Sequence, residues 1–527
     1  MELVKKNIHM NRQKGREVSQ IHLDEDQNVP DRKADVEKVI WEKSEIRVEE
    51  VRPAADHVFI RGVVCFDILY MDHERSQQMH SMHGRLPFED TIQMEGVAPQ
   101  DNLCVEWELL QPAVTVINSR KINFRAVITL TVTLEEVYDE DITVDLYEAP
   151  QMFQKKQTAS LLQMKVSKKD ILRIRNQWQL PADKPNIGEI LFYTVTAKGV
   201  RIRCLENRLL VQGTFLIFAL YQGEPEGSAP AYCSYEIPFE ETLDCSNCQE
   251  NMISHIPWEL GMHELEIKPD SDGELRVLSF EGVLELSIKL YEEEEVEGIV
   301  DVYSVAQEVK PQIKMTQFTR LLVKNETECR TAKRMKIADT SARVLQICHS
   351  DGSVQLKQTE PVEKGLKAEG EIAISVLYIT ADDMQPLRLA KGTIPFSQVI
   401  DMPNLSASSS GDGYLYHVVP SLEQLSVQMM DSEEMEIKAV IRMDAIVFDK
   451  HEEPVLTDII CMPMDYEKLN QLPGMVGYRV CPGDDLWTIA KANYTTTEKL
   501  MQINGLKDEQ LRPGMQLIVL KELPAMQ

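Results

Sequence analysis

The chain has 527 residues, of which 43% are hydrophobic and 27% charged, a balance typical of soluble globular proteins with three or four domains. Its net charge of −29 argues against a nucleic-acid-binding protein, because phosphate contacts need a basic face. The N-terminal stretch lacks the apolar core of a signal peptide, no segment approaches the roughly 20 apolar residues of a membrane span, and the ten Cys show no regular spacing. We therefore expect no membrane span and a product that begins in the reducing cytoplasm.

The chain begins with a polar, basic stretch over residues 1–20, where we expect a flexible or helical lead-in. One cassette then occurs three times: a Gly, an alternating apolar strand that ends in Tyr 8 residues later, and a Pro-Phe pair whose Pro lies 25 residues after the Gly. Spacing kept in three copies indicates a three-fold internal repeat. The copies are Gly62-VVCFDIL-Tyr70 with Pro87-Phe88, Gly213-TFLIFAL-Tyr221 with Pro238-Phe239, and Gly370-EIAISVL-Tyr378 with Pro395-Phe396.

Each cassette strand alternates with a period of two residues, which predicts a strand with one face on a core. The opposite face differs between copies: the second is apolar enough to be covered on both sides, whereas the third is half polar and is expected to be half exposed. The Pro-Phe pair indicates a following edge strand or bend, where the missing N–H of Pro is tolerated. The inward positions are Val64, Phe66, Ile68 and Tyr70; Phe215, Ile217, Ala219 and Tyr221; and Ile372, Ile374, Val376 and Tyr378.

A second strand is shared by the copies and starts near residues 123, 279 and 436, with half-buried alternation. Residues 151–169 and 305–324 are expected to be linkers of helical or irregular character. The cassette glycines recur after 151 and 157 residues, too long a period for a solenoid, whose units span roughly 20–50 residues. We therefore predict a mainly β protein of three tandem β-rich, sandwich-like units, each with its own core, joined like beads. The predicted boundaries are residues 21–148, 172–300 and 325–465.

After residue 473 the pattern changes to a small βααβ unit, predicted for residues 476–522. It consists of a short strand, a Pro-Gly-Asp turn, two short helices with apolar residues at core spacing, and a final strand. The expected caps are Asp484 or Asp485 for the first helix, Thr495 with Glu498 for the second, and Asn504-Gly505 at the end of the second.

This C-terminal unit resembles the LysM domain, because aromatic-x-Val, Pro-Gly-Asp-x-Leu-Trp-x-Ile-Ala, Leu-x-x-x-Asn-Gly-Leu and Leu-x-Pro-Gly-x-x-Leu follow one another in the family's order. In that family two loops form a shallow groove for N-acetylglucosamine polymers. Two departures disfavour sugar binding and leave the fold intact: Asp485 stands where Thr is usual, and Cys481 replaces a common Lys or Arg. The resemblance implies groove residues Gly483, Asp484, Asp485 and Leu486, with Asn504, Gly505, Leu506, Gly514 and Met515 opposite.

The Gly, Leu-Tyr and Pro-Phe signature of the repeats resembles the SPOCS domain, a module of spore-forming Firmicutes. SPOCS repeats followed by a C-terminal LysM domain are similar in order to the SipL-like family of spore-coat morphogenetic proteins, over nearly the whole chain. That resemblance implies a protein of the mother-cell cytoplasm at the forespore surface and in the spore coat. It also implies binding to the coat basement-layer ATPase, stage IV sporulation protein A, and to other coat proteins.

Some residues have a sharper and a plainer interpretation. Cys245-SN-Cys248 has the spacing of a redox pair or of half a zinc site, but the sequence has no second such pair, so a loop with two free thiols is favoured. Three His crowd one loop and are interpreted as a polar loop rather than a metal site. Trp487 is expected in the small core rather than as a sugar-stacking surface. The three His are His73, His80 and His83.

No phosphate-binding loop, nucleophile elbow, zinc-protease motif or dinucleotide fingerprint occurs in the sequence. We therefore expect no catalytic residues, no metal and no cofactor, and no nucleic-acid partner. The favoured function is a non-enzymatic scaffold of coat assembly that binds a protein through its LysM domain. The alternatives are a peptidoglycan-binding protein of the cell wall or spore cortex and, more weakly, a hydrolase with an unfamiliar catalytic site in one repeat.

Overall fold

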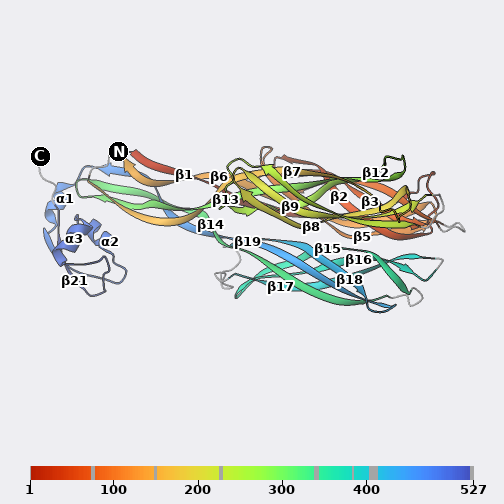
Figure 1. Cartoon of the computed structure of the whole chain (residues 1–527). Coiled ribbons are helices and arrows are strands. Elements are labelled where there is room, and N and C mark those ends of the chain that lie inside the picture. The colour runs from red at the N-terminus through yellow and green to blue at the C-terminus, as the bar shows by residue number, and fades with distance from the viewer. Residues whose placement is uncertain are drawn as a thin grey trace.

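The computed structural model describes residues 2–72, 78–147, 151–224, 230–337, 343–382, 385–402 and 414–522. Antiparallel strands dominate this part of the chain, so the predicted mainly β class is confirmed. The molecule is elongated: packed β-sheets fill one half, long strands continue toward the other end, and the helices gather there near the N-terminus (Figure 1).

Each repeat folds into two antiparallel sheets that enclose a core. The first repeat shows the plan, because its cassette strand is the middle strand of one sheet and the second shared strand is the middle strand of the other. The cassette sheet has the order β2 (Lys38–Ala54), β3 (His57–Met71), β4 (Met79–Gln93). The other sheet has the order β1 (Glu2–Asn28), β6 (Lys121–Tyr147), β5 (Asn102–Asn118).

The second and third repeats have the same plan, with one short additional strand in the second. The second repeat contains β8 (Ile187–Leu205), β9 (Arg208–Gly223) and β10 (Ala231–Asp244), and β7 (Met152–Gln179), β13 (Leu275–Ser304), β12 (Trp258–Pro269) and β11 (Ile253–His255). The third contains β15 (Val344–Val362), β16 (Gly365–Thr380) and β17 (Leu387–Asp401), and β14 (Glu308–Lys336), β19 (Glu434–Met462) and β18 (Tyr414–Met429).

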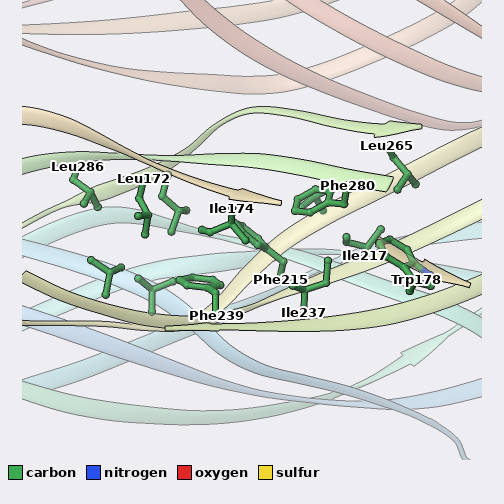
Figure 2. Packing of buried hydrophobic residues seen from close by; sticks show 14 of the residues in the cluster. Leu172, Ile174, Trp178, Phe215, Ile217, Ile237, Phe239, Leu265, Phe280 and Leu286 are labelled. Atoms are coloured by element: carbon green, nitrogen blue, oxygen red, sulfur yellow. The ribbon is translucent and has the colours of Figure 1, made fainter. Parts of the chain in front are cut away.

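The two sheets of each repeat share a separate apolar core, as predicted. Figure 2 shows the core of the second repeat, where Phe215 and Ile217 of β9 face Leu172 and Ile174 of β7. Phe280 of β13 meets Phe215 edge to face, with ring centroids 5.3 Å apart. All twelve inward positions predicted for the cassette strands are buried. Period-two alternation therefore identified the core face correctly.

The cassette is explained by cross-strand pairing. In every copy the Gly lies directly opposite the Phe of the Pro-Phe pair, and the ring occupies the space that a side chain on the Gly would need. The Pro precedes that Phe on β4, β10 or β17, which are edge strands, as predicted. The pairs are Gly62 with Phe88, Gly213 with Phe239, and Gly370 with Phe396.

The expected lead-in and linkers are wrong, because these segments form strands. Residues 2–28, 152–179 and 308–336 are the long strands β1, β7 and β14, which pair with β6, β13 and β19 along their whole length. Beyond the sandwiches, each pair continues as a two-stranded ribbon, and we call the three ribbons together the stalk. Their polar composition has a simple cause: each ribbon turns one face to the narrow stalk core and the other to solvent, so few apolar residues are needed.

The stalk core draws side chains from all three repeats. One layer contains Phe318, which is fully buried, and a second layer lies closer to the tip. Six strands from three distant parts of the chain must therefore assemble before the stalk can form. The first layer is Ile8, Met10, Ile142, Leu161, Val296, Phe318 and Val455, and the second is Leu146, Ile299, Val302, Leu456 and Ile459.

The repeats are also packed against one another, which corrects the picture of separate beads. Trp41 of the first repeat stacks on Phe192 of the second at 4.4 Å between ring centroids, and Leu377 of the third joins the same cluster. Phe218 and Leu220, on the outer face of the second cassette strand, are buried in this cluster, so that strand is covered on both sides, as predicted.

Candidate functional site in the C-terminal module

The C-terminal module has the predicted order of strand, two helices and strand. After α1 (Tyr466–Gln471), it consists of β20 (Met475–Arg479), α2 (Leu486–Ala492), α3 (Thr497–Asn504) and β21 (Gln516–Leu520). The two strands pair antiparallel, and the helices cover a small core. Its buried residues are Val480, Leu486, Ile489, Leu500, Leu517 and Val519.

The helix ends agree with the sequence at two of three points. Asp485 caps α2 and accepts a 2.8 Å hydrogen bond from the N–H of Thr488. Gly505 ends α3 at a φ of 61°, the left-handed conformation expected there. The capping box predicted at Thr495 is wrong, because Thr496 caps α3 and Thr495 is buried instead. Neighbouring Thr residues offer the same hydroxyl, so spacing alone did not separate them.

Backbone hydrogen bonds bring the loop before α2 next to the loop before β21. Val480 donates to the carbonyl of Met515 at 2.9 Å and accepts from the N–H of Gly514 at 2.8 Å. Gly483, Gly505 and Gly514 are exposed, each with positive φ. The loops therefore present backbone N–H and C=O groups without side chains, a surface suited to hydrogen bonding with an extended ligand.

Four of the predicted groove side chains are used within the module, and one of them is Asp485 as the cap of α2. The Asp484 carboxylate accepts from the Tyr478 hydroxyl at 2.8 Å and from the Cys481 N–H at 2.7 Å. The Asn504 amide joins α3 to β21 through Ile518, and Leu486 lies in the core. The remaining side chains, Leu506 and Met515, are partly exposed and pack on the core. The arrangement can bind a ligand by backbone hydrogen bonds and apolar contact, and the nine-residue groove stays a prediction.

The helix α2 and its capping residue Asp485 dock on the tip of the stalk. Lys155 of β7 forms an ion pair with Asp485 at 2.6 Å, and Asp301 of β13 pairs with Lys491 at 2.6 Å. Burial opposes ionisation of Asp485, but hydrogen bonds from Lys155 and Thr488 outweigh it and hold the pKa of this carboxyl at about 2. Asp485 is therefore charged at neutral pH and neutralised by a residue of the second repeat.

Trp487 belongs to this docking contact, not to the module core. Its Nε1 donates to Asp301 at 2.8 Å, and its ring meets Tyr303 edge to face at 4.7 Å. Phe153 stacks on Tyr303 at 5.1 Å between ring centroids, and Ala490 is fully buried in the same cluster. This contact was not predicted from the sequence. The available signal was Asp485, a charge at a position where the LysM family usually has Thr.

The Cys pair lies in the core of the second repeat. Cys245 and Cys248 are buried, and burial raises the pKa of Cys248 to about 11. The same turn in the first repeat holds Met94 and Val97, with matching backbone hydrogen bonds to the residue just before the cassette strand, Asp56 in the first repeat and Asn207 in the second. Two apolar residues thus occupy the equivalent positions, which supports the interpretation of the thiols as small core side chains.

The other polar candidates have ordinary partners. His73 lies outside the described residues, His80 pairs with Asp72 at 3.2 Å, and His83 pairs with Asp67. Within the described part of the chain, no group of three or more His, Cys, Asp or Glu side chains is arranged to hold a metal ion.

Comparison with known families assigns both parts of the chain. A family model described as the SipL, SPOCS domain matches residues 35–117, 186–268 and 343–430, and a LysM domain model matches residues 478–519. None of the curated proteins and none of the solved structures gives a significant match. Among the described residues, no helix is long and apolar enough to cross a membrane. The SPOCS matches cover the cassette strands and leave most of the stalk outside.

Proposed function

We propose, from the premise that this chain belongs to the SipL-like family with three SPOCS domains and a LysM domain, that it is a non-enzymatic scaffold of spore-coat assembly. The coarser statement, a sporulation-related coat protein with a module of the peptidoglycan-binding type, follows from the domains themselves. In the finer proposal the protein works in the mother-cell cytoplasm at the forespore surface. There its LysM module binds the basement-layer ATPase, stage IV sporulation protein A, and its repeats meet other coat proteins.

The observation that carries this proposal is the position of the module at the tip of a stiff rod. The strand β13 runs without interruption from the sandwich to the stalk tip over 30 residues, which corresponds to roughly 100 Å at about 3.3 Å per residue. All six long strands are hydrogen-bonded to a partner along their length. A rod that holds a binding loop at one end and broad β-surfaces at the other suits a tether between a surface and an assembling layer.

The alternative, binding to peptidoglycan, is favoured by the LysM match and by the exposed glycine loops. Sugar polymers need hydrogen-bonding groups and an apolar platform, and Leu506 beside Gly505 supplies a small one. The first groove loop has two polar side chains, and both already have partners. Asp484 is hydrogen-bonded within the module and Asp485 is paired with Lys155 of the stalk, so neither is free to bind a sugar hydroxyl. We therefore place a protein ligand first and a glycan second.

The proposal is tested with a fluorescent fusion of the full chain during sporulation. Leu506→Gln weakens the apolar edge of the groove, and Met475→Gln is the matched control, because Met475 is 63% exposed on β20. We expect the wild type and the control to encircle the forespore and Leu506→Gln to be diffuse, with α3 protected from hydrogen exchange in all three proteins, which shows that the module stays folded.

A binding assay separates the two ligands. Purified basement-layer ATPase and purified peptidoglycan are each incubated with the same three proteins. Binding to the ATPase that Leu506→Gln weakens supports the proposal. Salt-resistant binding to peptidoglycan alone, weakened by the same substitution, would replace it with the alternative. A diffuse fusion of the wild-type chain would refute the forespore-surface location.

A further inference from the structure

The three ribbons of the stalk carry a β-bulge at the same place. In β6, β13 and β19 one extra residue is inserted, and an Asp follows it. The carboxylate of each Asp accepts a hydrogen bond from the next backbone N–H at 2.8 or 2.9 Å, so the acid has a structural role in every ribbon. The residue opposite the Asp differs. The pairs are Val4 with Asp145, Lys155 with Asp301, and Gln312 with Asp458.

Only the pair of Lys155 with Asp301 contains a cation, and the LysM module docks on this pair. Lys155 reaches Asp485, and the two oxygens of Asp301 accept from Lys491 and from the indole of Trp487. Each side of the contact thus supplies one cation and one carboxylate. We call these five residues the latch.

We propose that the latch holds the LysM module in a docked state, and that a ligand covering the first groove loop has to release Lys155 from Asp485. The docked chain then binds its ligand more weakly than an undocked chain. This inference rests on the proposed function of the groove as a binding site.

Competition follows from the position of Asp485. It directly follows Gly483 and Asp484 in the first groove loop, and its carboxylate accepts from the Thr488 N–H, the Thr488 hydroxyl and the Lys155 ammonium. A ligand over this loop meets the ammonium group of Lys155 and a carboxylate that already has three donors. Binding and docking therefore draw on the same group.

The contact is weak enough to open. The Lys155 and Asp485 side chains are 42% and 45% exposed, and ion pairs this exposed to solvent stabilise little. The apolar part is small: Trp487 and Ala490 pack against Phe153, Tyr303 and Val305. One buried hydrogen bond, from the Tyr303 hydroxyl to the Thr495 carbonyl at 3.1 Å, also joins the stalk to the module. Only undocked molecules can bind the ligand, so the apparent affinity decreases in proportion to the undocked fraction. A modest preference for the docked state therefore lowers the apparent affinity by about 3- to 10-fold.

The test uses the full chain with Lys155→Gln, which introduces the residue that the third ribbon has at this position. Lys156→Gln is the matched control, because Lys156 is exposed and lies beside Asp145 rather than the module. Asp301→Asn opens the latch from the other strand. Hydrogen exchange of α2 reports docking, and titration with an N-acetylglucosamine oligomer and with the basement-layer ATPase reports binding.

We expect faster exchange in α2 and about 3- to 10-fold tighter binding for Lys155→Gln and Asp301→Asn, with the control equal to the wild type. Raising the salt concentration should tighten binding of the uncharged oligomer to the wild type and to the Lys156→Gln control, because screening weakens the latch that both retain. Faster exchange without tighter binding would overturn the competition, and unchanged exchange would overturn the latch itself. If no protein binds either probe, the proposed function fails as well, and exchange alone then decides whether the module is docked.

Discussion

The cassette glycines make a sharp prediction, because the structure gives the atoms that an added methyl group would meet. A Cβ at Gly213 would lie 2.6 Å from Cζ of Phe239, 3.1 Å from Cε1 of the same ring and 3.2 Å from a methyl of Val200. Overpacking of this kind costs about 1–3 kcal/mol. Replacing Gly in a strand returns about 0.5–1 kcal/mol of chain entropy. We therefore expect Gly213→Ala to destabilise the second repeat by about 0.5–2 kcal/mol.

A double-mutant cycle tests the cause. Phe239→Ala alone should cost about 3–5 kcal/mol, since the ring is buried. With the ring removed, the methyl of Gly213→Ala has room, so the double variant should be more stable than the sum by about 1–2 kcal/mol. At Gly370 the added Cβ would also lie 2.1 Å from the backbone carbonyl oxygen of Gln355. Removing Phe396 cannot relieve that clash, and the coupling there should be smaller.

Local unfolding free energies from hydrogen exchange of β9 and β16 measure both cycles repeat by repeat. This readout is needed because the sequence has no Trp in the third repeat. Additive costs at Gly213 and Phe239 would refute the explanation of the cassette as a glycine covered by a cross-strand ring. Equal coupling in the two repeats would refute the role of the carbonyl.

Three further predictions concern other contacts of the fold. Arg201 of the second repeat forms ion pairs with Glu423 of β18 at 3.0 Å and Glu326 of β14 at 3.8 Å, so Arg201→Ala should speed hydrogen exchange of β14 and β18 by about 5-fold, for a partly exposed contact worth about 1 kcal/mol. Burial lowers the pKa of His349 from 6.5 to about 4, so this residue should cost stability as the pH drops from 6.5 toward 4, by about 2 kcal/mol at pH 5. In urea unfolding, His349→Gln should reduce the acid dependence by that amount and leave the share of His255, whose pKa burial lowers to about 3. Thr496→Ala should cost about 1 kcal/mol of module stability, seen as faster exchange in α3, whereas Thr495→Ser should leave that cap intact.

The sequence predicted what local patterns encode. The period-two alternation of apolar residues correctly predicted the buried face of every cassette strand. The constant spacing from Gly to Phe reflects the strand register, in which Gly213 lies opposite Phe239. The stalk was missed because the buried residues of one ribbon, such as Ile8 and Met10, are too sparse to show a period. Their partners lie more than a hundred residues away in the chain, so their burial depends on tertiary packing rather than on local propensity.

One ion pair joins a residue that is unusual for a LysM domain to a residue that differs from its equivalents in the other two ribbons. Asp485 replaces the usual Thr of a LysM domain, although Thr would cap α2 nearly as well. Lys155 stands where the other ribbons have Val4 and Gln312, which support the same bulge. Neither departure is needed by the module or by the ribbon alone, whereas together they form the 2.6 Å contact between them. Docking of the module on the second repeat is therefore the one role that accounts for both, and it distinguishes this repeat from the other two.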